Sequence, residues 1–303
     1  MAATTMKVRQ KKKIFTQDHV ITVIGNLLLA IFLLLIIIPI IYILLCSIMD
    51  PATRSSVGVT FDISHWTLEG YERVFQDENI WRGFANSFFY SIAFTAISVV
   101  ITMFAAYPMS REDFMGRKFF NAFFVFTMFF GGGLMPTYLL MDQLGLINTI
   151  WAILLPGAAN VWNLILARSY YKTVPGELRE AAAVDGASDM QYFFKVLMPV
   201  CKPILAVLCL YQFVAMWNSY FDAMIYLDKQ DMQPLQLVIR AILVQNQINP
   251  NLIADMEKMA ETAKLADLLK YSTIVISSVP LLLMYPFFSE YFEKGIMIGS
   301  VKG

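Results

Sequence analysis

Side chains that could carry out catalysis are few in this sequence of 303 residues, and they lie far apart. His19 and His65 are its two histidines, and neither belongs to an H-E-x-x-H zinc motif. The sequence also lacks the G-x-S-x-G motif of a nucleophilic serine and the Gly-Lys pair that an ATP-binding P-loop requires. Cys46, Cys201 and Cys209 have no paired spacing, so neither a zinc site nor a disulfide framework is indicated. We therefore expect a non-catalytic chain that holds no metal or cofactor of its own.

A polar segment, 171–200, stands out because it interrupts an otherwise apolar part of the sequence. Pro175 suits the first turn of a helix, where a missing backbone N–H costs nothing. Glu177 and Glu180 place negative charge near the positive end of a helix dipole, and three consecutive alanines, which favour helix, follow them. These features predict a short helix over 176–184.

A second short helix is predicted directly after the first. Gly186 should end the first helix, because glycine readily adopts the left-handed backbone conformation that closes helices. Ser188, followed three residues later by Gln191, has the spacing of a capping box, which starts a helix. The apolar face of this helix would contain Phe193, and the helix should end before Pro199. The segment should thus form a compact helix–turn–helix between two apolar runs.

The rest of the sequence has the composition of a membrane protein. Hydrophobic residues make up 58% of the chain and charged residues 15%, and the mean hydropathy is +0.59. A helix needs about 20 apolar residues to span a bilayer. Six runs reach or approach this length, with 150–167 the shortest, and a basic tail, 1–18, precedes the first of them. The runs are 19–49, 83–110, 119–141, 150–167, 203–227 and 271–289.

The distribution of basic residues predicts how these spans are oriented. Most of the 23 Lys and Arg residues fall in the tail, in the loops 111–118 and 168–202, and near the C-terminus. Because basic residues concentrate in loops that stay in the cytoplasm, both termini should be cytoplasmic. The segments 50–82 and 228–270 would then be large external loops. In the second of these, amphipathic stretches on either side of 249–251 are expected to form short surface helices.

The polar segment contains Glu180-Ala181-Ala182, then Asp185-Gly186-Ala187, and then Phe193 and Pro199. This order and spacing resemble the EAA motif of permease subunits of bacterial ABC importers. The resemblance implies an all-α membrane protein with six transmembrane helices and the type I importer permease fold, located in the bacterial cell membrane. It also implies that 171–200 is a coupling loop, which docks on a cytoplasmic ATPase subunit and passes ATP-driven movement to the spans. We keep the name coupling loop for 171–200. The residues that carry the motif, and that we expect to contact or support the ATPase, are Glu180, Ala181, Ala182, Asp185, Gly186, Ala187, Phe193 and Pro199.

The individual roles within the motif are also predictions. Gly186 should provide the turn and Ala187 a close approach between chains, while Glu180 and Asp185 should cap helices or make polar contacts with the ATPase.

The resemblance continues outside the coupling loop, over roughly 70–303. The segments 131–171, 217–227, 234–239 and 299–303 are similar to those of the carbohydrate-uptake branch, and most similar to permeases for aldouronates and other complex oligosaccharides. This chain then looks like the second permease of a maltose-type pair. The resemblance implies a heterodimer with another permease, two ATPase subunits that bind ATP and magnesium, and an external sugar-binding protein.

A sugar path should be lined by amides, hydroxyls and aromatic rings rather than by charges. Gln212, Ser219 and Asp222 have a spacing that places them on roughly one face of the fifth span. The neighbours Trp217 and Asn218 extend this group. Asn160 and Asn163 share a face of the fourth span. All of these are candidates for the sugar path, and hydrogen bonding between spans, worth about 0.6 kcal/mol for each bond, is the alternative.

A glycine run, 131–133, with Pro136 after it should interrupt the third span. A break at membrane depth persists where protein or water covers the backbone, so it would shape a cavity or gate; close helix packing through small residues is the alternative.

Two other functions are compatible with a chain of apolar spans. An ion-coupled secondary carrier also lacks a nucleotide motif, but such carriers often have ionisable residues within the spans and inverted repeats. The spans here are almost free of charge, and no convincing repeat is present. A membrane scaffold or receptor subunit is the other alternative, and it would need no ATPase partner.

Overall fold

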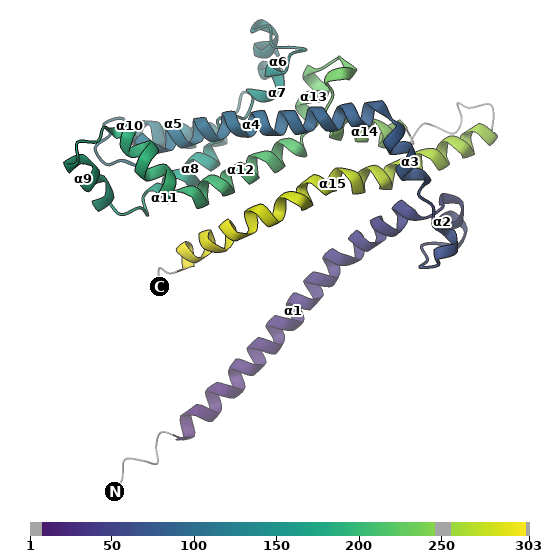
Figure 1. Cartoon of the computed structure of the whole chain (residues 1–303), viewed down its shortest axis with the longest axis horizontal. Helices are drawn as coiled ribbons and strands as arrows, with labels where there is room; N and C mark the ends of the chain where they lie inside the picture. The colour runs from purple at the N-terminus through teal and green to yellow at the C-terminus, as the bar shows by residue number, and fades with distance from the viewer. Residues whose placement is uncertain (1–7, 246–255, 301–303) are drawn as a thin grey trace. The chain divides into compact units, whose positions relative to one another are not determined.

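The computed structural model describes residues 8–245 and 256–300, and within these residues the chain is helical (Figure 1). The only β pairing there is one isolated bridge between Met49 and Trp66. The prediction of an all-α chain is confirmed. The helices form two compact units, the described residues of Met1–Glu72 with Ile253–Val275, and those of Arg73–Leu252 with Ile276–Gly303.

The first unit contains the N-terminal helix α1 (Val8–Ile48), α2 (Pro51–Val57), a 3₁₀ turn (Ile63–His65), most of the residues that precede α4, and the first part of α15 (Met256–Ser300). Asp50 caps α2 by accepting a hydrogen bond from the Thr53 N–H at 3.1 Å.

Two ion pairs join α2 and its cap to α15 within the first unit. Arg54 pairs with Asp267, and Lys264 Nζ lies 3.3 Å from Asp50 Oδ1. The helix α3 (Glu69–Gln76) approaches α15 so closely that a Cβ atom on Gly70 would lie 3.0 Å from the Leu268 carbonyl oxygen. These contacts explain why the first unit is compact although it is built from segments far apart in the sequence.

The second unit is organised around the long helix α4 (Glu78–Ser110). Asp77 caps it by accepting a hydrogen bond from the Asn79 N–H at 2.8 Å. Along its length α4 packs against α8 (Val161–Tyr171), α12 (Lys202–Trp217) and α14 (Leu235–Gln245). Figure 1 shows α4 and α12 running side by side.

Shorter elements complete the second unit. They are α5 (Arg117–Phe129), α6 (Leu134–Gln143), α7 (Trp151–Leu154), α9 (Glu177–Val184), α10 (Asp189–Tyr192), a π-helical turn (Phe193–Leu197), α11 (Met198–Val200), α13 (Phe221–Tyr226), a 3₁₀ turn (Gln230–Met232) and the end of α15.

Three described helices are long and apolar enough to cross a membrane: His19–Ile48, Glu78–Ser110 and Ala266–Ser289. Two bent helix pairs, α5 with α6 and α10–α11 with α12, raise the number to five if each pair is one span. The first, second and sixth predicted spans thus correspond to long helices. The count of six spans, the orientation and the single domain 19–303 stay predictions.

The third predicted span, 119–141, is interrupted at the glycine run. The helix α5 ends at Phe129, α6 begins at Leu134, and the two axes differ by 112°. Gly133 has φ +85°, a conformation that side-chain-bearing residues rarely adopt. The predicted break is confirmed, while the role of a gate stays a prediction.

The fourth predicted span, 150–167, is wrong as a single helix. The chain forms only one helical turn, α7, and then leaves the helical conformation until α8 begins at Val161. Pro156 and Gly157, which has φ +74°, explain the interruption. Apolar composition alone did not reveal that these two residues divide the run.

The expected surface helices of 228–270 are only partly correct. The first stretch forms α14, in which Leu235, Leu237 and Ile239 are buried. The second stretch is not a separate short helix, because α15 begins at Met256 and continues without a break through the sixth predicted span. The break expected at 249–251 lies outside the described residues.

Candidate functional site

The first helix of the coupling loop, α9, ends in a Schellman motif. Gly186 has φ +75°, and its N–H donates to the Ala183 carbonyl at 3.1 Å. The Ala187 N–H donates back to the Ala182 carbonyl at 2.9 Å. These two bonds are the pair that defines the motif. The sequence-based prediction that Gly186 provides the turn agrees with this geometry.

The second helix starts at the predicted capping box. The Gln191 N–H donates to Ser188 Oγ at 3.3 Å, and the Ser188 N–H donates to Gln191 Oε1 at 2.8 Å. The two short helices are thus joined by a turn in which both helix ends have their free backbone groups satisfied.

The end of the second helix differs from the prediction. The chain stays helical through Pro199 to Val200, and α12 begins at Lys202 after a bend of 79°. The π-helical turn ends two residues before Pro199, and the Met198 N–H donates to the Phe193 carbonyl there. Proline cannot donate to the carbonyl four residues earlier and its ring crowds that carbonyl. A local π turn, rather than a helix end, is how this chain accommodates it.

One face of the coupling loop is buried against α4 and α8. Ala182 is buried on α9, and Phe193, of which 1% is exposed, lies at the start of the π turn. The ring of Phe193 is 5.1 Å from that of Phe104 and 5.2 Å from that of Tyr107, both on α4. The burial of this face explains why a small residue fits at 182 and an aromatic residue at 193 in this chain.

The opposite face of the coupling loop is exposed. Glu180, Ala181 and Asp185 are exposed, Val184 is 88% exposed, and Met190 is 57% exposed. Small and apolar side chains thus lie beside two carboxylates on a surface with no partner within the described chain. Such a surface can be covered by a groove that offers both apolar contacts and hydrogen-bond donors.

Charged residues that the sequence analysis did not select connect this loop to the end of α4. Arg111 donates to both carboxylate oxygens of Asp113, at 2.9 and 2.5 Å, and forms an ion pair with Asp189. Arg179 Nη2 lies 3.1 Å from Asp113 Oδ2 and 3.8 Å from Asp189 Oδ1. We call these four residues the charged cluster. Its members come from the end of α4, from the following loop, from α9 and from α10, and no spacing rule connects such distant positions.

Within the charged cluster, the Asp113 carboxyl stays ionised over the physiological pH range. Its hydrogen bonds with Arg111 and then with Arg179 hold the pKa of the Asp113 carboxyl well below its usual range. A lowered folded-state pKa means that the stabilisation is complete above the unfolded pKa of about 4 and is lost only as the pH falls through the lower folded value. The Asp113 carboxyl should therefore not change its charge between pH 5 and 8.

A cavity of about 430 Å³ lies behind the coupling loop, between the ends of α4 and α8 and the start of α9. Its lining is mixed, with Tyr107, Tyr171, Lys172 and Arg179 among the residues that face it. The aromatic contacts and the charged cluster therefore lie beside unfilled space at this end of α4.

The two asparagines of the fourth predicted span have different surroundings. Asn160 is exposed and caps α8, accepting a hydrogen bond from the Asn163 N–H at 3.0 Å. The side chain of Asn163 is buried.

Gln212 and Trp217 on α12 are buried and hydrogen-bonded within the second unit. Gln212 Nε2 donates to Ser98 Oγ on α4, which donates to the Ala158 carbonyl at 2.6 Å. Trp217 Nε1 donates to the Ser277 carbonyl at 3.1 Å.

The expected single face of Gln212, Ser219 and Asp222 is wrong, because α12 ends at Trp217. Asn218 is the C-terminal cap of α12 and exposed, with its Nδ2 donating to the Val214 carbonyl at 2.9 Å. Ser219 lies in the turn that follows, and Asp222 lies half-buried in the first turn of α13. The turn changes the chain direction, so the spacing of one continuous helix does not apply.

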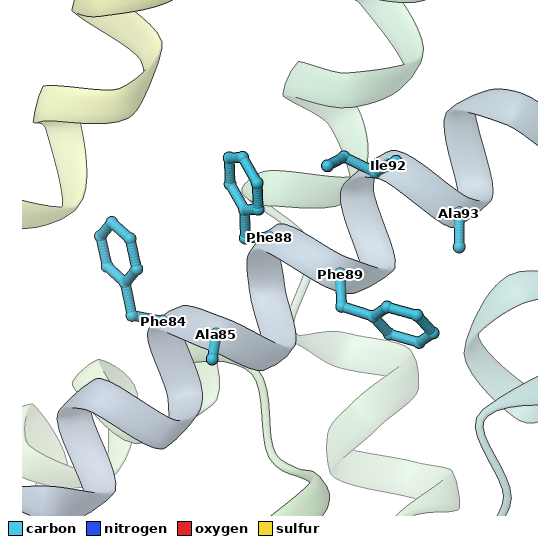
Figure 2. Close-up of a pocket in the computed structure, with 6 residues that line it drawn as sticks. All are labelled: Phe84, Ala85, Phe88, Phe89, Ile92 and Ala93. Carbon is cyan, nitrogen blue, oxygen red and sulfur yellow. The ribbon is translucent and has the colours of Figure 1, made fainter.

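A hollow of about 460 Å³ on α4 offers no alternative polar site (Figure 2). Figure 2 shows the rings of Phe84, Phe88 and Phe89 projecting from the helix beside smaller apolar side chains. None of the side chains that line it can donate or accept a hydrogen bond, so it offers a sugar aromatic rings but no hydrogen-bonding group. In the described part of the chain, no group of three His, Cys, Asp or Glu side chains could hold a metal ion.

Comparison with known proteins identifies the family. A model of the family described as binding-protein-dependent transport system inner membrane component matches residues 114–296, which include the whole coupling loop. The chain belongs to this family. It is therefore the membrane component of a transport system, and the coupling loop and charged cluster lie at one end of its α4.

Relatives and a solved structure support the same family assignment. The chain is 33% identical over 276 residues to the polygalacturonan/rhamnogalacturonan transport system permease protein YtcP of Bacillus subtilis (strain 168), covering 91% of this chain and 96% of that one. It is 29% identical to the maltodextrin transport system permease protein MdxG of the same organism, and the match covers 90% of this chain and 94% of MdxG. Its structure is also similar to that of a chain in the crystal structure of a bacterial ABC transporter involved in the import of the acidic polysaccharide alginate, with a TM-score of 0.79 and 31% sequence identity. The match covers 91% of this chain and 98% of that chain.

For an inner membrane component of this family, the buried hydrogen bond of Gln212 gives a first prediction. Replacing Gln212 by leucine should lower the free energy of unfolding by less than about 1 kcal/mol, because a hydrogen bond between membrane helices averages about 0.6 kcal/mol. Substrate uptake should stay near the wild-type rate, since Ser98 keeps its bond to the Ala158 carbonyl. Uptake into cells and the thermal midpoint of the purified protein check this; a large loss of uptake with normal stability would place Gln212 in the substrate path.

Proposed function

We propose that this chain is a permease subunit of an ATP-driven ABC importer that takes up oligosaccharides across the bacterial cell membrane. The observation that carries the proposal is the coupling loop: a rigid turn with one face buried against α4 and an exposed face of small, apolar and acidic residues. Membership of a transport family agrees with it. Neither a secondary carrier nor a scaffold needs such a loop, and the family assignment lends them no support.

The proposed mechanism is alternating access driven from the cytoplasm. Both termini and the coupling loop face the cytoplasm in this proposal, and the ATPase binds the exposed face that contains Ala181 and Val184. Closure of two ATPase subunits on ATP and magnesium then moves the loop. The buried residues Ala182 and Phe193 carry this movement to α4, which packs against α8 and α12. The chain itself contributes no catalytic residue.

The remaining partners follow from the same proposal. A second permease completes a heterodimeric pathway, and an external binding protein delivers the sugar to it. Among the proteins compared, one is named for polygalacturonan and rhamnogalacturonan, one for maltodextrin, and the solved structure for alginate. The substrate class we propose is therefore an oligosaccharide derived from a polysaccharide.

The sugar path is proposed to pass the turn between α12 and α13. Asn218, Ser219 and Asp222 lie there at positions that are exposed or half-buried, whereas Gln212 and Trp217 are committed to internal hydrogen bonds. Asn160 is exposed at the start of α8 and is also a candidate, with Asn163 behind it. A carboxylate is a strong acceptor for sugar hydroxyl groups.

Replacing Asp222 by alanine should lower sugar uptake by about tenfold, the loss expected for one hydrogen bond to a charged group. Recovery of the ATPase with the tagged chain should not change, because Asp222 is far in sequence from the coupling loop. Asp231, exposed on the 3₁₀ turn Gln230–Met232, is the matched control, and alanine there should leave uptake unchanged. Equal uptake for wild type and the Asp222 variant would remove Asp222 from the path.

The decisive experiment is purification of the tagged chain from native membranes in detergent, followed by identification of the proteins recovered with it. The proposal requires a second permease and an ATPase, and ATP-dependent uptake of an oligosaccharide after reconstitution of the complex with a binding protein. Recovery of the chain alone, with solute uptake that needs an ion gradient instead of ATP, would show a secondary carrier. Recovery without any uptake, but with a stable receptor or enzyme partner, would support a scaffold.

A further inference from the structure

We propose that Arg111 is a positioning residue for energy coupling, which makes the end of α4 follow the movement of the coupling loop. The proposal rests on the proposed function, because it assumes that the loop is moved by an ATPase. It goes beyond that function by assigning a role to a residue outside the coupling loop and its motif.

The position of Arg111 allows it to move α4 directly. It is the C-terminal cap of α4, where its N–H donates to the Pro108 carbonyl at 3.2 Å. The helix is continuous from Glu78 to Ser110, unlike the third, fourth and fifth predicted spans. A displacement of one end of an unbroken helix is shared by the whole helix, and α4 packs against α8, α12 and α14 along the way.

The side chain of Arg111 binds the segment that follows α4 and the coupling loop at the same time. Its Nε and one terminal nitrogen bind Asp113, which follows α4, while its other terminal nitrogen binds Asp189 at the start of α10. The same nitrogen lies 3.3 Å from the Tyr107 hydroxyl. The planar fork of a guanidinium can make these bonds in several directions simultaneously, whereas a lysine ammonium holds no comparable geometry.

Arg179 strengthens the same connection from the other helix of the loop. It lies on α9 and approaches both Asp113 and Asp189. Two cations and two carboxylates therefore alternate across α9, α10 and the end of α4. Movement of α9 or α10 changes the distances between the charged groups on these helices and Arg111. The charged cluster therefore responds to movement of either helix of the loop.

A purely stabilising role explains this arrangement less well. The side chains of Asp113 and Asp189 are 54% and 60% exposed, and exposed ion pairs contribute little to stability. Packing of the loop on α4 is already provided by Phe193 and its aromatic neighbours. In contrast, a geometric link between α4 and the loop needs only that the side chain which makes it has a defined position. Arg111 meets this condition, because only 17% of its side chain is exposed.

The test uses the complete importer, purified with its partners and reconstituted with its binding protein. Arg111→Gln should lower sugar uptake per ATP hydrolysed by about tenfold, with unchanged recovery of the ATPase and an unchanged thermal midpoint. Arg111→Lys should restore part of the loss. Arg82→Gln is the matched control, because Arg82 pairs with Glu78 at the other end of the same helix.

A double-mutant cycle identifies the partner through which Arg111 acts. Asp189→Asn should reduce coupling in the same direction, and the variant with both Arg111→Gln and Asp189→Asn should be no worse than Arg111→Gln alone. Additive losses would contradict a shared link.

Three results would overturn the proposal. Wild-type uptake per ATP for Arg111→Gln would show that the link is not used. Loss of the ATPase from the purified complex, or a lowered thermal midpoint, would show that Arg111 serves assembly or stability. If the wild-type chain recovers no ATPase, the proposed function itself fails, and this is seen before any variant is made.

Discussion

Replacing Gly186 by valine is expected to abolish sugar-stimulated ATP hydrolysis by the assembled importer. Gly186 has φ +75°, and a β-branched residue is strained by more than about 1 kcal/mol in that conformation. The strain is conformational and not a clash, because a Cβ atom built on Gly186 meets nothing within 4 Å. The chain can relieve it only by changing φ, which breaks the hydrogen bonds from Gly186 and Ala187 to α9 and redirects α10.

Two further variants distinguish backbone strain at Gly186 from a general effect of adding a side chain to the exposed face of the coupling loop. Gly186→Asn should keep most of the activity, because asparagine tolerates the left-handed conformation. Gly176→Val should also be close to wild type, because Gly176 has φ −62° and free space around its Cβ position. The measurement is sugar-stimulated ATPase activity in proteoliposomes, together with the amount of ATPase recovered with the tagged chain.

Other results would require a different account of the loop. Full coupling by Gly186→Val would show that the exact turn is not needed. Equal losses for the valine and asparagine variants would indicate that any side chain blocks the contact surface, in which case backbone strain is not the cause.

Replacing Phe193 by alanine is expected to produce the largest loss of stability in the coupling loop, about 3 kcal/mol or more. The side chain is 1% exposed and fills the space between the loop and the rings of Phe104 and Tyr107. Removal of the ring leaves a cavity in a core to which α8 and α12 also contribute. The thermal midpoint of the purified protein in detergent measures the loss.

The neighbouring phenylalanine provides a matched control for this prediction. Phe194 is 54% exposed, so Phe194→Ala removes the same atoms from a less buried place and should lower the midpoint much less. Similar midpoints for the two variants would mean that Phe193 is not the residue that holds the loop on α4.

The geometry of the coupling loop was largely predictable because its signals are local. The capping box of Ser188 and Gln191 and the turn at Gly186 depend on groups within six residues of one another. Backbone hydrogen bonding and the conformational freedom of glycine decide such features wherever the loop lies in the fold. The effect of Pro199 was judged incorrectly, because a proline can be accommodated by a π turn when the surrounding helix is held by tertiary packing.

The arrangement of the spans was predicted less accurately than their presence. Apolar composition identified long helices at Glu78–Ser110 and Ala266–Ser289, but it did not show that the run 150–167 is divided at Pro156 and Gly157. The composition of a segment indicates how much apolar surface it can bury. The direction of the backbone through that segment depends on the turns within it. The same reason explains the error over Gln212 and Asp222, whose spacing was counted along a helix that ends at Trp217.

By itself, the sequence determined that this protein is an α-helical membrane protein with two short helices joined by a turn at Gly186, because apolar composition, glycine conformation and helix capping act over short distances along the chain. Only the tertiary structure decided that Arg111, Asp113, Arg179 and Asp189 meet. It also decided that Gln212 bonds to Ser98 on α4. Contacts between residues far apart in sequence depend on how helices pack, and packing is decided by the shapes of many side chains together, which no local pattern encodes.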